Sequence, residues 1–286
     1  MERPLTNISY IKDLCERYGF RFDKKFGQNF IVNPSVCPRM VDYSGIDGNS
    51  GVIEIGTGFG TLTRELSRAA GKVVAIEIDT SLTELLKETL ADCDNVTVIF
   101  DDVLNVDLKK LIEEQFKGMD VYVCANLPYY ITSPIIMKLL EDELPVKAIT
   151  VMVQKEAAQR LCALPGSRDT GAISLAVQYY STPSVCFSVS PGSFYPPPKV
   201  TSSVIRLDIG RKDTIAPRDP ASMFKLIRAA FSQRRKTFSN SVSNTLGIDR
   251  AAIEDALCQL DLDTKIRPEK LTLEDFSHLS DILLSE

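Results

Sequence analysis

Between residues 51 and 153, short runs rich in valine and isoleucine alternate with longer amphipathic segments. The runs expected to be strands are residues 51–55, 72–78, 95–100, 120–125 and 146–153. Their near-continuous apolar content is typical of parallel strands that are covered on both faces. The helices expected between and after them are residues 60–69, 80–91, 107–116 and 132–141. This alternation predicts an α/β fold with a doubly wound, Rossmann-like sheet.

Two helices are expected before this core. Ile8, Ile11 and Leu14 recur on one face of a first helix. A second helix is expected to begin at Asn33 and Pro34, because a polar cap is followed there by proline at the first helical position. These helices form an N-terminal extension of the core.

The chain changes character near residue 210. Two more strands are expected at 183–190 and 200–209, and turn-forming residues then cluster in 209–220. The helices expected after this point are residues 221–231, 233–245, 250–260 and 272–284. We therefore expect two domains, a Rossmann-like domain over 1–209 with its N-terminal helical extension and a small all-helical domain over 210–286.

Composition excludes several classes of function. The chain has one histidine, His278, in a segment with the period of a surface helix, and its seven cysteines form no C-x-x-C pair. We therefore expect no metal site and no histidine-dependent catalysis. The 33 Lys and Arg against 38 Asp and Glu give a net charge of −5, which excludes a polycation that coats nucleic acid. Without a signal-peptide pattern or an apolar run of ~20 residues, we expect a cytoplasmic protein away from membranes, monomeric by default.

A glycine-rich loop joins the first strand of the core to its helix. It contains Gly56, Gly58 and Gly60 and therefore has the spacing G-x-G-x-G. Such a loop brings bare backbone close to a ligand beside the N-terminus of a helix. The dinucleotide fold of a dehydrogenase requires a third glycine at position 61, which is Thr61 here. We therefore reject a dehydrogenase.

Acidic residues follow the next two strands of the core. Glu77 ends the second strand, where a carboxylate can accept both hydroxyl groups of a ribose. Asp101 and Asp102 follow the third strand, at the edge of the sheet where ligands bind in open α/β folds. Two solvated loop acids are the structural alternative for this pair. Together with the glycine loop, these residues favour an adenosyl ligand without a pyrophosphate, and S-adenosylmethionine fits that description.

The fourth strand ends in Asn126, Leu127, Pro128 and Tyr129, a sequence that can also be ordinary turn material. After a strand of a methyl-donor fold, it suits the exocyclic amine of adenine, whose lone pair is delocalised into the ring. The Asn126 side-chain oxygen and the Leu127 carbonyl can accept hydrogen bonds from the N–H groups of this amine, and Pro128 stiffens the turn. Tyr129 can stack on the extruded base. The motif therefore predicts methylation of adenine N6.

Six blocks of sequence occur in an order that resembles a known family. They are F-G-Q-N-F (26–30), E-I-G-T-G-F-G-T-L-T (54–63), N-L-P-Y-Y (126–130), Q-K-E (154–156), F-Y-P-P-P-K-V-T-S-S-V (194–204) and S-Q-R-R-K-T (232–237). Together they closely resemble the KsgA/RsmA family of small-subunit ribosomal RNA adenine dimethyltransferases, in the form found in Gram-positive bacteria. The resemblance extends over essentially the whole chain.

The resemblance implies an enzyme that transfers methyl groups from S-adenosylmethionine to two adjacent adenosines of 16S rRNA. They lie in the loop of the hairpin near the 3′ end, and the implied substrate is an assembling 30S particle, with a role in small-subunit biogenesis. The residues that it implies for the donor site are Asn29, Ile31, Gly56, Gly58, Glu77, Asp102 and Asn126. Among them, Glu77 is implied at the ribose and Asp102 at the amine of the donor's adenine.

Contacts to RNA are expected from basic side chains, which can neutralise phosphates. The candidates are Lys24, Lys25, Arg234, Arg235 and Lys236. The last three are expected on the helix over 233–245, where a run of charges is also what an ordinary solvated face shows. Phe194 can form a second stacking wall of the target-base pocket. The segment 194–199 can equally be a rigid corner that joins two strands.

Three rival functions remain to be weighed. The Erm type, which methylates 23S rRNA, shares the donor fold but usually has isoleucine in place of Leu127. The proline-rich block at 194–199 and the basic block at 232–237 favour the small-subunit enzyme. A DNA adenine methyltransferase is disfavoured because no target-recognition domain is apparent. A binding protein that has lost the chemistry is disfavoured by an intact Asn126–Tyr129 motif, although an assembly checkpoint can accompany catalysis.

Overall fold

The computed structural model describes residues 4–23, 27–210, 215, 217–233 and 235–284. The chain divides into two compact units, of which the first contains residues 1–158 and 183–209 and the second residues 159–182 and 210–286. The expected domain division differs from this, because it assigns 159–182 to the first domain. The physical reason is packing: Leu175 and Tyr179 share a hydrophobic cluster with residues such as Leu226 in the C-terminal part.

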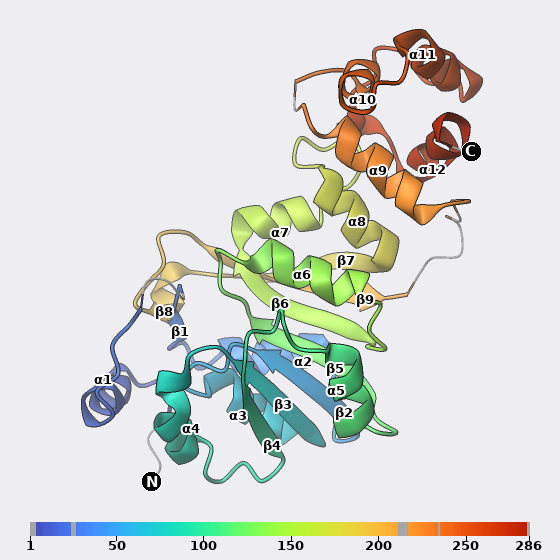
Figure 1. The fold of residues 1–286 in the computed structure, drawn as a ribbon. Helices are drawn as coiled ribbons and strands as arrows, with labels where there is room; N and C mark the ends of the chain where they lie inside the picture. The colour runs from blue at the N-terminus through green and yellow to red at the C-terminus, as the bar shows by residue number, and fades with distance from the viewer. Residues whose placement is uncertain (1–3, 24–26, 211–214, 216, 234, 285–286) are drawn as a thin grey trace. The chain divides into compact units, whose positions relative to one another are not determined.

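The first unit is built on a seven-stranded sheet in the order β4-β3-β2-β5-β6-β9-β7 (Figure 1). The strands are β2 (Ser50–Ile55), β3 (Lys72–Glu77), β4 (Val96–Phe100), β5 (Asp120–Asn126), β6 (Ala148–Gln154), β7 (Ser181–Val189) and β9 (Ser202–Ile209). Strands β2 to β6 pair in parallel, and β9 runs antiparallel to β6. The predicted Rossmann-like sheet is confirmed, and each strand begins and ends within two residues of its expected bounds.

The strand order reverses at β2, which lies between β3 and β5. In open α/β sheets the chain leaves in opposite directions at such a point, and a crevice opens at the carboxyl ends of the two central strands. The helices around this sheet are α2 (Val36–Ser44), α3 (Thr61–Ala69), α4 (Thr83–Thr89), α5 (Leu108–Gln115), α6 (Thr132–Glu141) and α7 (Lys155–Leu161), with short 3₁₀ turns η2 (Thr80–Leu82) and η3 (Pro191–Ser193). In Figure 1, α2 and α3 lie behind the sheet, and α5 and α6 lie in front of it.

The N-terminal part consists of α1 (Ile8–Arg17) and a segment that leads to α2. The second helix begins at Val36, not at Asn33 as expected. The Asn33 side-chain oxygen accepts a hydrogen bond from the backbone of Ser35, and the Asn33 carbonyl accepts one from Val36. These bonds form a separate turn before the helix, because an asparagine side chain competes with the backbone for such partners.

A small two-stranded sheet fixes the segment between these helices. It consists of β1 (Phe30–Ile31) and β8 (Phe194–Tyr195), which run antiparallel. Ile31 is therefore paired with Phe194, and both side chains belong to one buried cluster that also includes Met40 of α2. The proline-rich corner thus holds the N-terminal segment at the edge of the first unit.

The second unit is helical. Its helices are α8 (Ala172–Tyr180), α9 (Pro220–Ala230), α10 (Phe238–Leu246), α11 (Arg250–Gln259) and α12 (Leu273–Leu283), with a 3₁₀ turn η4 (Pro268–Lys270). The helix expected over 233–245 begins only at Phe238. Thr237 caps it, since its hydroxyl group accepts a hydrogen bond from the backbone of Asn240. Within the described part of the chain, no helix is both long and apolar enough to cross a bilayer.

Candidate active site

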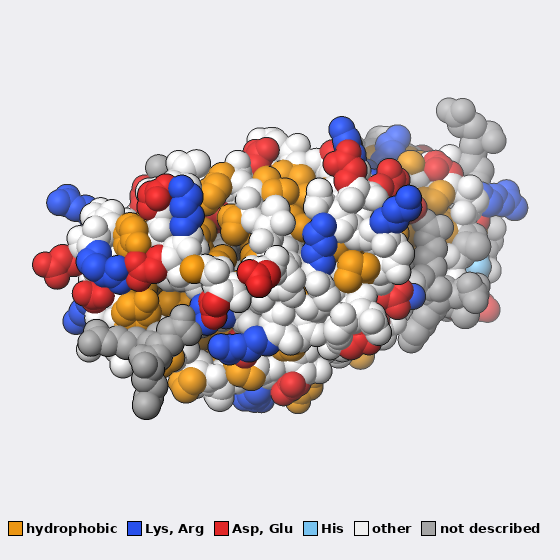
Figure 2. Space-filling view, turned by 90° about the horizontal axis from the view of Figure 1, so that it is seen from below, with side chains coloured by type: hydrophobic (Ala, Val, Ile, Leu, Met, Phe, Trp, Pro, Cys, Tyr) orange, Lys and Arg blue, Asp and Glu red, His pale blue; other side chains and the backbone are white. Residues whose placement is uncertain are grey.

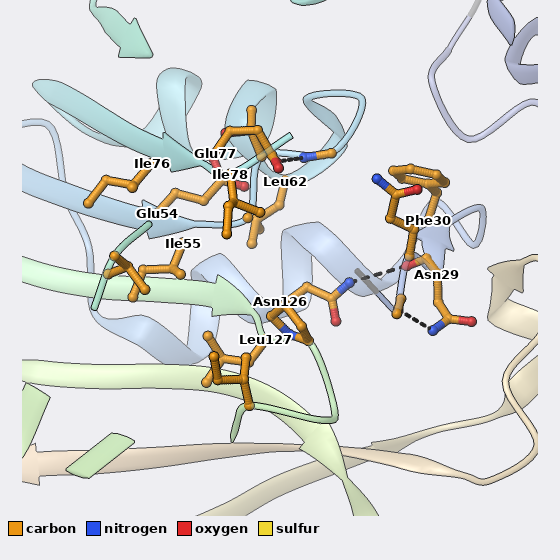
Figure 3. Close-up of a pocket in the computed structure, with 18 of the residues that line it drawn as sticks. Asn29, Phe30, Glu54, Ile55, Leu62, Ile76, Glu77, Ile78, Asn126 and Leu127 are labelled. Carbon is orange, nitrogen blue, oxygen red and sulfur yellow. Dashed lines mark hydrogen bonds between the residues drawn. The ribbon is translucent and has the colours of Figure 1, made fainter. Parts of the chain in front are cut away.

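A pocket opens at the carboxyl ends of the central strands, where the strand order reverses (Figure 3). It encloses about 1020 Å³ of empty space, part of which is open to solvent. Its walls come from the ends of β2, β3 and β5, from the loop after β4 and from residues 27–31. Segments far apart in the sequence therefore meet at one edge of the sheet, as the sequence predicts for a ligand site.

The glycine loop forms one wall of this pocket. Gly56, Gly58 and Gly60 all have left-handed backbones, with φ of 80°, 55° and 86°. At Gly58 an added Cβ would also lie 2.9 Å from a ring carbon of Phe30, whose ring stacks on Phe59 at a centroid distance of 4.1 Å. Both the conformation and the close approach require glycine. At these glycines the loop therefore presents backbone to the pocket.

Glu77 lies at the end of β3 with its carboxylate in the pocket wall and only 5% exposed. Its two oxygens accept hydrogen bonds of 2.9 Å from the backbone N–H groups of Gly58 and Asp79. Burial raises the pKa of Glu77, and these two hydrogen bonds oppose that effect. The bonds fix the carboxylate beside the glycine loop, where its remaining lone pairs can accept hydroxyl groups of a ligand.

Asp101 and Asp102 both line the pocket in the loop after β4. Asp101 is exposed, and Asp102 is partly buried and accepts a 2.9 Å hydrogen bond from the backbone of Leu104. Between these acids and Glu77 the pocket wall is apolar, with Val103 buried and Ile78 43% exposed. An exposed isoleucine beside acceptor groups suits a flat heterocycle with polar edges.

Asn126 closes β5, and its side chain turns toward the N-terminal segment (Figure 3). Its Nδ2 donates to the backbone carbonyl of Asn29 at 3.3 Å. Among the described residues, its Oδ1 has no hydrogen-bond partner. The next residue, Leu127, donates its N–H to Met152 of β6 at 3.1 Å, which fixes the start of the turn. Pro128 and Tyr129 follow and also line the pocket.

The pocket wall contains buried polar groups that a ligand can pair with. Both carboxylate oxygens of Glu54 and the hydroxyl group of Thr57 are buried and lack a hydrogen-bond partner in the described part of the chain. Glu54 and Thr57 line the pocket, and burial raises the pKa of Glu54 well above its usual range. Because buried polar groups are nearly always paired, a ligand rich in N–H and O–H groups fits here. S-adenosylmethionine, with its amines and ribose hydroxyls, is such a ligand.

The residues expected to bind donor are thus brought together. The pocket wall contains Asn29, Ile31, Gly56, Gly58, Glu77, Asp102 and Asn126. Gln28 was not assigned a role from the sequence, although it lies in the quoted block 26–30. It donates a 2.7 Å hydrogen bond to Asp79, the residue that also bonds Glu77. The sequence G-Q-N at residues 27–29, in a chain that also has a glycine loop, is the one sequence feature that indicates a role for Gln28.

The structure describes some of the residues expected to contact RNA. Phe194 is 3% exposed and packs in the core, so the expectation that its ring faces the target base is corrected in favour of the rigid corner. Arg235 and Lys236 are exposed in the turn before α10, not on the helix. Lys24, Lys25 and Arg234 lie outside the described residues.

The chain is similar to a known family and to known proteins. The family described as "Ribosomal RNA adenine dimethylase" matches residues 19–283. The chain is 46% identical over 287 residues to the "Ribosomal RNA small subunit methyltransferase A" of Bacillus licheniformis, covering 99% of this chain and 98% of that protein.

Two solved structures are also similar. A dimethyladenosine transferase from Plasmodium falciparum has a TM-score of 0.73 and 27% identity, over 87% of this chain and 95% of that one. The 23S rRNA methyltransferase ErmE has a TM-score of 0.66 and 23% identity, over 90% of this chain and all of that one, and therefore shares the fold. The match of the family over nearly the whole chain, together with a pocket in which a glycine loop faces the end of β5, establishes that the chain belongs to the ribosomal RNA adenine dimethylase family.

Proposed function

We propose that this protein transfers methyl groups from S-adenosylmethionine to the N6 amines of two adjacent adenosines in the 3′-terminal hairpin loop of 16S rRNA. The substrate is an immature 30S particle in the cytoplasm, and the enzyme acts as a monomer. The observation that carries the proposal is the Oδ1 of Asn126, which has no partner among the described residues and lies in the same pocket as the glycine loop and Glu77. An acceptor for the target amine and a site for the donor are thus adjacent.

The donor site is assigned to residues from four strand ends. Glu77 accepts hydrogen bonds from the ribose hydroxyl groups, while the N–H group of Gly58 holds the Glu77 carboxylate in place. Asp102 accepts a hydrogen bond from the amine of the donor's adenine, and Ile78 and Val103 cover the adenine ring. The sulfonium group supplies an electrophilic methyl group. Asn29 and its neighbours close over the ligand, and the pairing of β1 with β8 fixes this segment to the first unit.

The target site is assigned to the motif that follows β5. The Asn126 side-chain oxygen and the Leu127 carbonyl accept the two N–H groups of adenine N6, which favours a pyramidal nitrogen with its lone pair directed at the methyl group. Tyr129 stacks on the base after extrusion from the RNA. A bond forms from N6 to the methyl carbon as the bond from carbon to sulfur breaks. The cationic amine then loses a proton to water, so no strong base is needed.

Positioning provides most of the rate in this proposal. Groups that hold two reactants in line convert a bimolecular step into an effectively unimolecular one. The fixed turn at Leu127, whose N–H bonds to Met152, supports this role because it sets the direction of the Leu127 carbonyl. Binding to the particle relies on local basic segments such as Arg235 and Lys236, since the net charge of the protein is −5 and basic side chains are mixed with acidic ones on the face that Figure 2 shows.

The experiment uses labelled S-adenosylmethionine with two substrates in parallel. One is the 30S particle that lacks adenine dimethylation, and the other is unmodified 23S rRNA. Digestion to nucleosides and mass analysis identify the product. We expect N6,N6-dimethyladenosine on the 30S particle alone, formed about 100- to 1000-fold more slowly by Asn126→Ala. Dimethyladenosine on 23S rRNA alone would assign the enzyme to the resistance type, and no transfer to either would overturn the proposal in favour of a binding protein.

A further inference from the structure

The phenol of Tyr129 forms a hydrogen bond to a residue outside the pocket. Its hydroxyl group lies 2.5 Å from the hydroxyl group of Ser202, which is 73 positions away in the sequence. Tyr129 lines the pocket, whereas Ser202 does not. Burial raises the pKa of Tyr129, so the phenol is neutral at pH 7 and can both donate and accept. The bond therefore connects the proposed base-stacking ring to a second element of the fold.

Ser202 is held rigidly at the start of β9. It is fully buried and pairs with Gln154 of β6, and the carbonyl of the preceding Thr201 accepts a 2.9 Å hydrogen bond from Lys155. Among the described residues, Tyr129 is the one hydrogen-bond partner found for the Ser202 side chain. A buried hydroxyl with a fixed backbone and one partner restricts where that partner can lie.

The same strand also fixes the other half of the target site. Asn126 pairs with Met152 of β6, and Leu127 donates its N–H to the Met152 carbonyl. Strand β6 therefore holds the acceptor groups on one side and, through β9, the Tyr129 ring on the other. The stacking plane and the two N–H acceptors have a common rigid support.

The neighbouring Tyr130 also lines the pocket and provides a comparison. Tyr130 is 58% exposed, and a Cβ added to Gly27 would lie 3.4 Å from its ring. No hydrogen bond of its hydroxyl group is found in the described part of the chain. Of the two adjacent rings at the pocket, Tyr129 alone is tied to the sheet.

We propose that Ser202 is a positioning residue for methyl transfer, which orients the Tyr129 ring so that a stacked adenine presents N6 to Asn126 and Leu127. This inference rests on the proposed function. Because Ser202 acts through Tyr129 and not on the donor, its loss affects the chemical step and leaves donor binding unchanged. A displacement of about 1 Å can lower a rate by as much as about 100-fold, so we expect Ser202→Ala to lower kcat about 10- to 100-fold.

The test compares Ser202→Ala with a matched control on the next residue. Ser203 is also buried on β9 and pairs with Val153, but it has no side-chain hydrogen bond among the described residues. Steady-state methylation of 30S particles gives kcat and KM, and calorimetry gives the dissociation constant for S-adenosylmethionine. We expect Ser202→Ala to lose kcat with the dissociation constant unchanged, and Ser203→Ala to match the wild type. Ser202→Thr, which keeps the hydroxyl group, restores kcat.

A double-mutant cycle separates positioning from a general structural role. Tyr129→Phe removes the same hydrogen bond from the other side, so the double variant should lose no more kcat than either single variant. Independent, multiplicative losses in the double variant overturn the inference, as do an unchanged kcat in Ser202→Ala or a weakened donor affinity equal to the loss of kcat. If the wild type itself fails to methylate 30S particles, the proposed function fails first, and this inference fails with it.

Discussion

The Nδ2 of Asn126 lies 3.3 Å from the backbone carbonyl oxygen of Asn29, although the two residues are 97 positions apart. An amide that donates through its nitrogen in one direction presents its oxygen in another. The bond therefore leaves the Asn126 oxygen for an N–H donor in the pocket and at the same time ties the N-terminal segment to the end of β5. The Asn126 side chain therefore joins the segment proposed to close over the donor to the group proposed to receive the target base.

Replacing Asn126 tests this arrangement directly. We expect Asn126→Ala to lower the rate of methyl transfer about 100- to 1000-fold, the usual loss when one pre-positioned hydrogen-bonding group of a transition state is removed. Single-turnover methylation of 30S particles measures the rate, and particle binding is measured alongside. Asn105→Ala is a control, since Asn105 is exposed and outside the pocket wall. Transfer within about threefold of wild type in Asn126→Ala would contradict the assignment.

Glu77→Gln should weaken donor binding. The amide that replaces the carboxylate cannot accept hydrogen bonds from both Gly58 and Asp79, and the ribose hydroxyls lose a charged acceptor. A hydrogen bond to a charged group contributes about 1.5–3 kcal/mol, so we expect the dissociation constant for S-adenosylmethionine to rise roughly 10- to 100-fold. Calorimetry measures it. Glu84→Gln is the matched control, because Glu84 is exposed and pairs with Lys87 away from the pocket.

Gly58→Ala should destabilise the protein and block the pocket. An alanine at φ 55° costs about 1–2 kcal/mol, and its Cβ would meet the Phe30 ring at 2.9 Å. We therefore expect the free energy of unfolding to fall by at least about 1 kcal/mol in urea titrations, together with a loss of donor affinity. Gly48→Ala has neither penalty, since no atom lies within 4 Å of its added Cβ. Equal stability of the two variants would show that the loop tolerates a side chain.

The fold and the grouping of the expected donor residues in one pocket could be predicted from the sequence because their signals are local. Buried parallel strands show as runs of valine and isoleucine, and Gly56, Glu77 and Asp102 occur at strand ends that a parallel sheet brings to one edge. The resemblance to a family added Asn29, whose place beside Asn126 depends on a contact across 97 residues. No local pattern indicates such a contact.

The errors have the same origin. The start of α10 was expected at residue 233, but the Thr237 cap determines it, and a charged run has no helix-start signal of its own. Phe194 was considered as a stacking ring, whereas pairing of β8 with β1 buries it beside Ile31. The bond from Tyr129 to Ser202 could not be predicted, because a serine in a strand shows no pattern that names its partner.

Arg235 and Lys236 should contribute to binding of the particle through charge alone. Both side chains are exposed before α10, and on that basis we expect each to neutralise an RNA phosphate. Removing one such contact weakens binding at low salt and reduces the slope of log affinity against log salt by about one. Affinity for 30S particles is measured from about 50 to 200 mM salt. Lys87→Ala is the control, since Lys87 pairs with Glu84 at 2.6 Å. Unchanged slopes for Arg235→Ala and Lys236→Ala would remove this turn from the RNA surface.

Glu54→Gln should stabilise the donor-free protein, and more so at high pH. Glu54 is fully buried and unpartnered in the described part of the chain, and burial raises its pKa well above the usual value. The folded state therefore holds this proton at pH values where the unfolded chain has released it. Folding free energy is lost as the pH rises from about 4.3, the value in an unfolded chain, toward the raised folded value.

Glutamine resembles the protonated carboxyl group in shape but does not titrate, so the variant escapes this loss. The difference in melting temperature between Glu54→Gln and wild type should be small at about pH 5 and larger at about pH 8, both above the unfolded pKa of glutamate. Scanning calorimetry at the two pH values measures it, with the exposed Glu84→Gln as a control that shows no such trend. A difference that is the same at both pH values would mean that Glu54 is ionised in the folded protein, and that the pocket already stabilises a buried negative charge before the cationic donor binds.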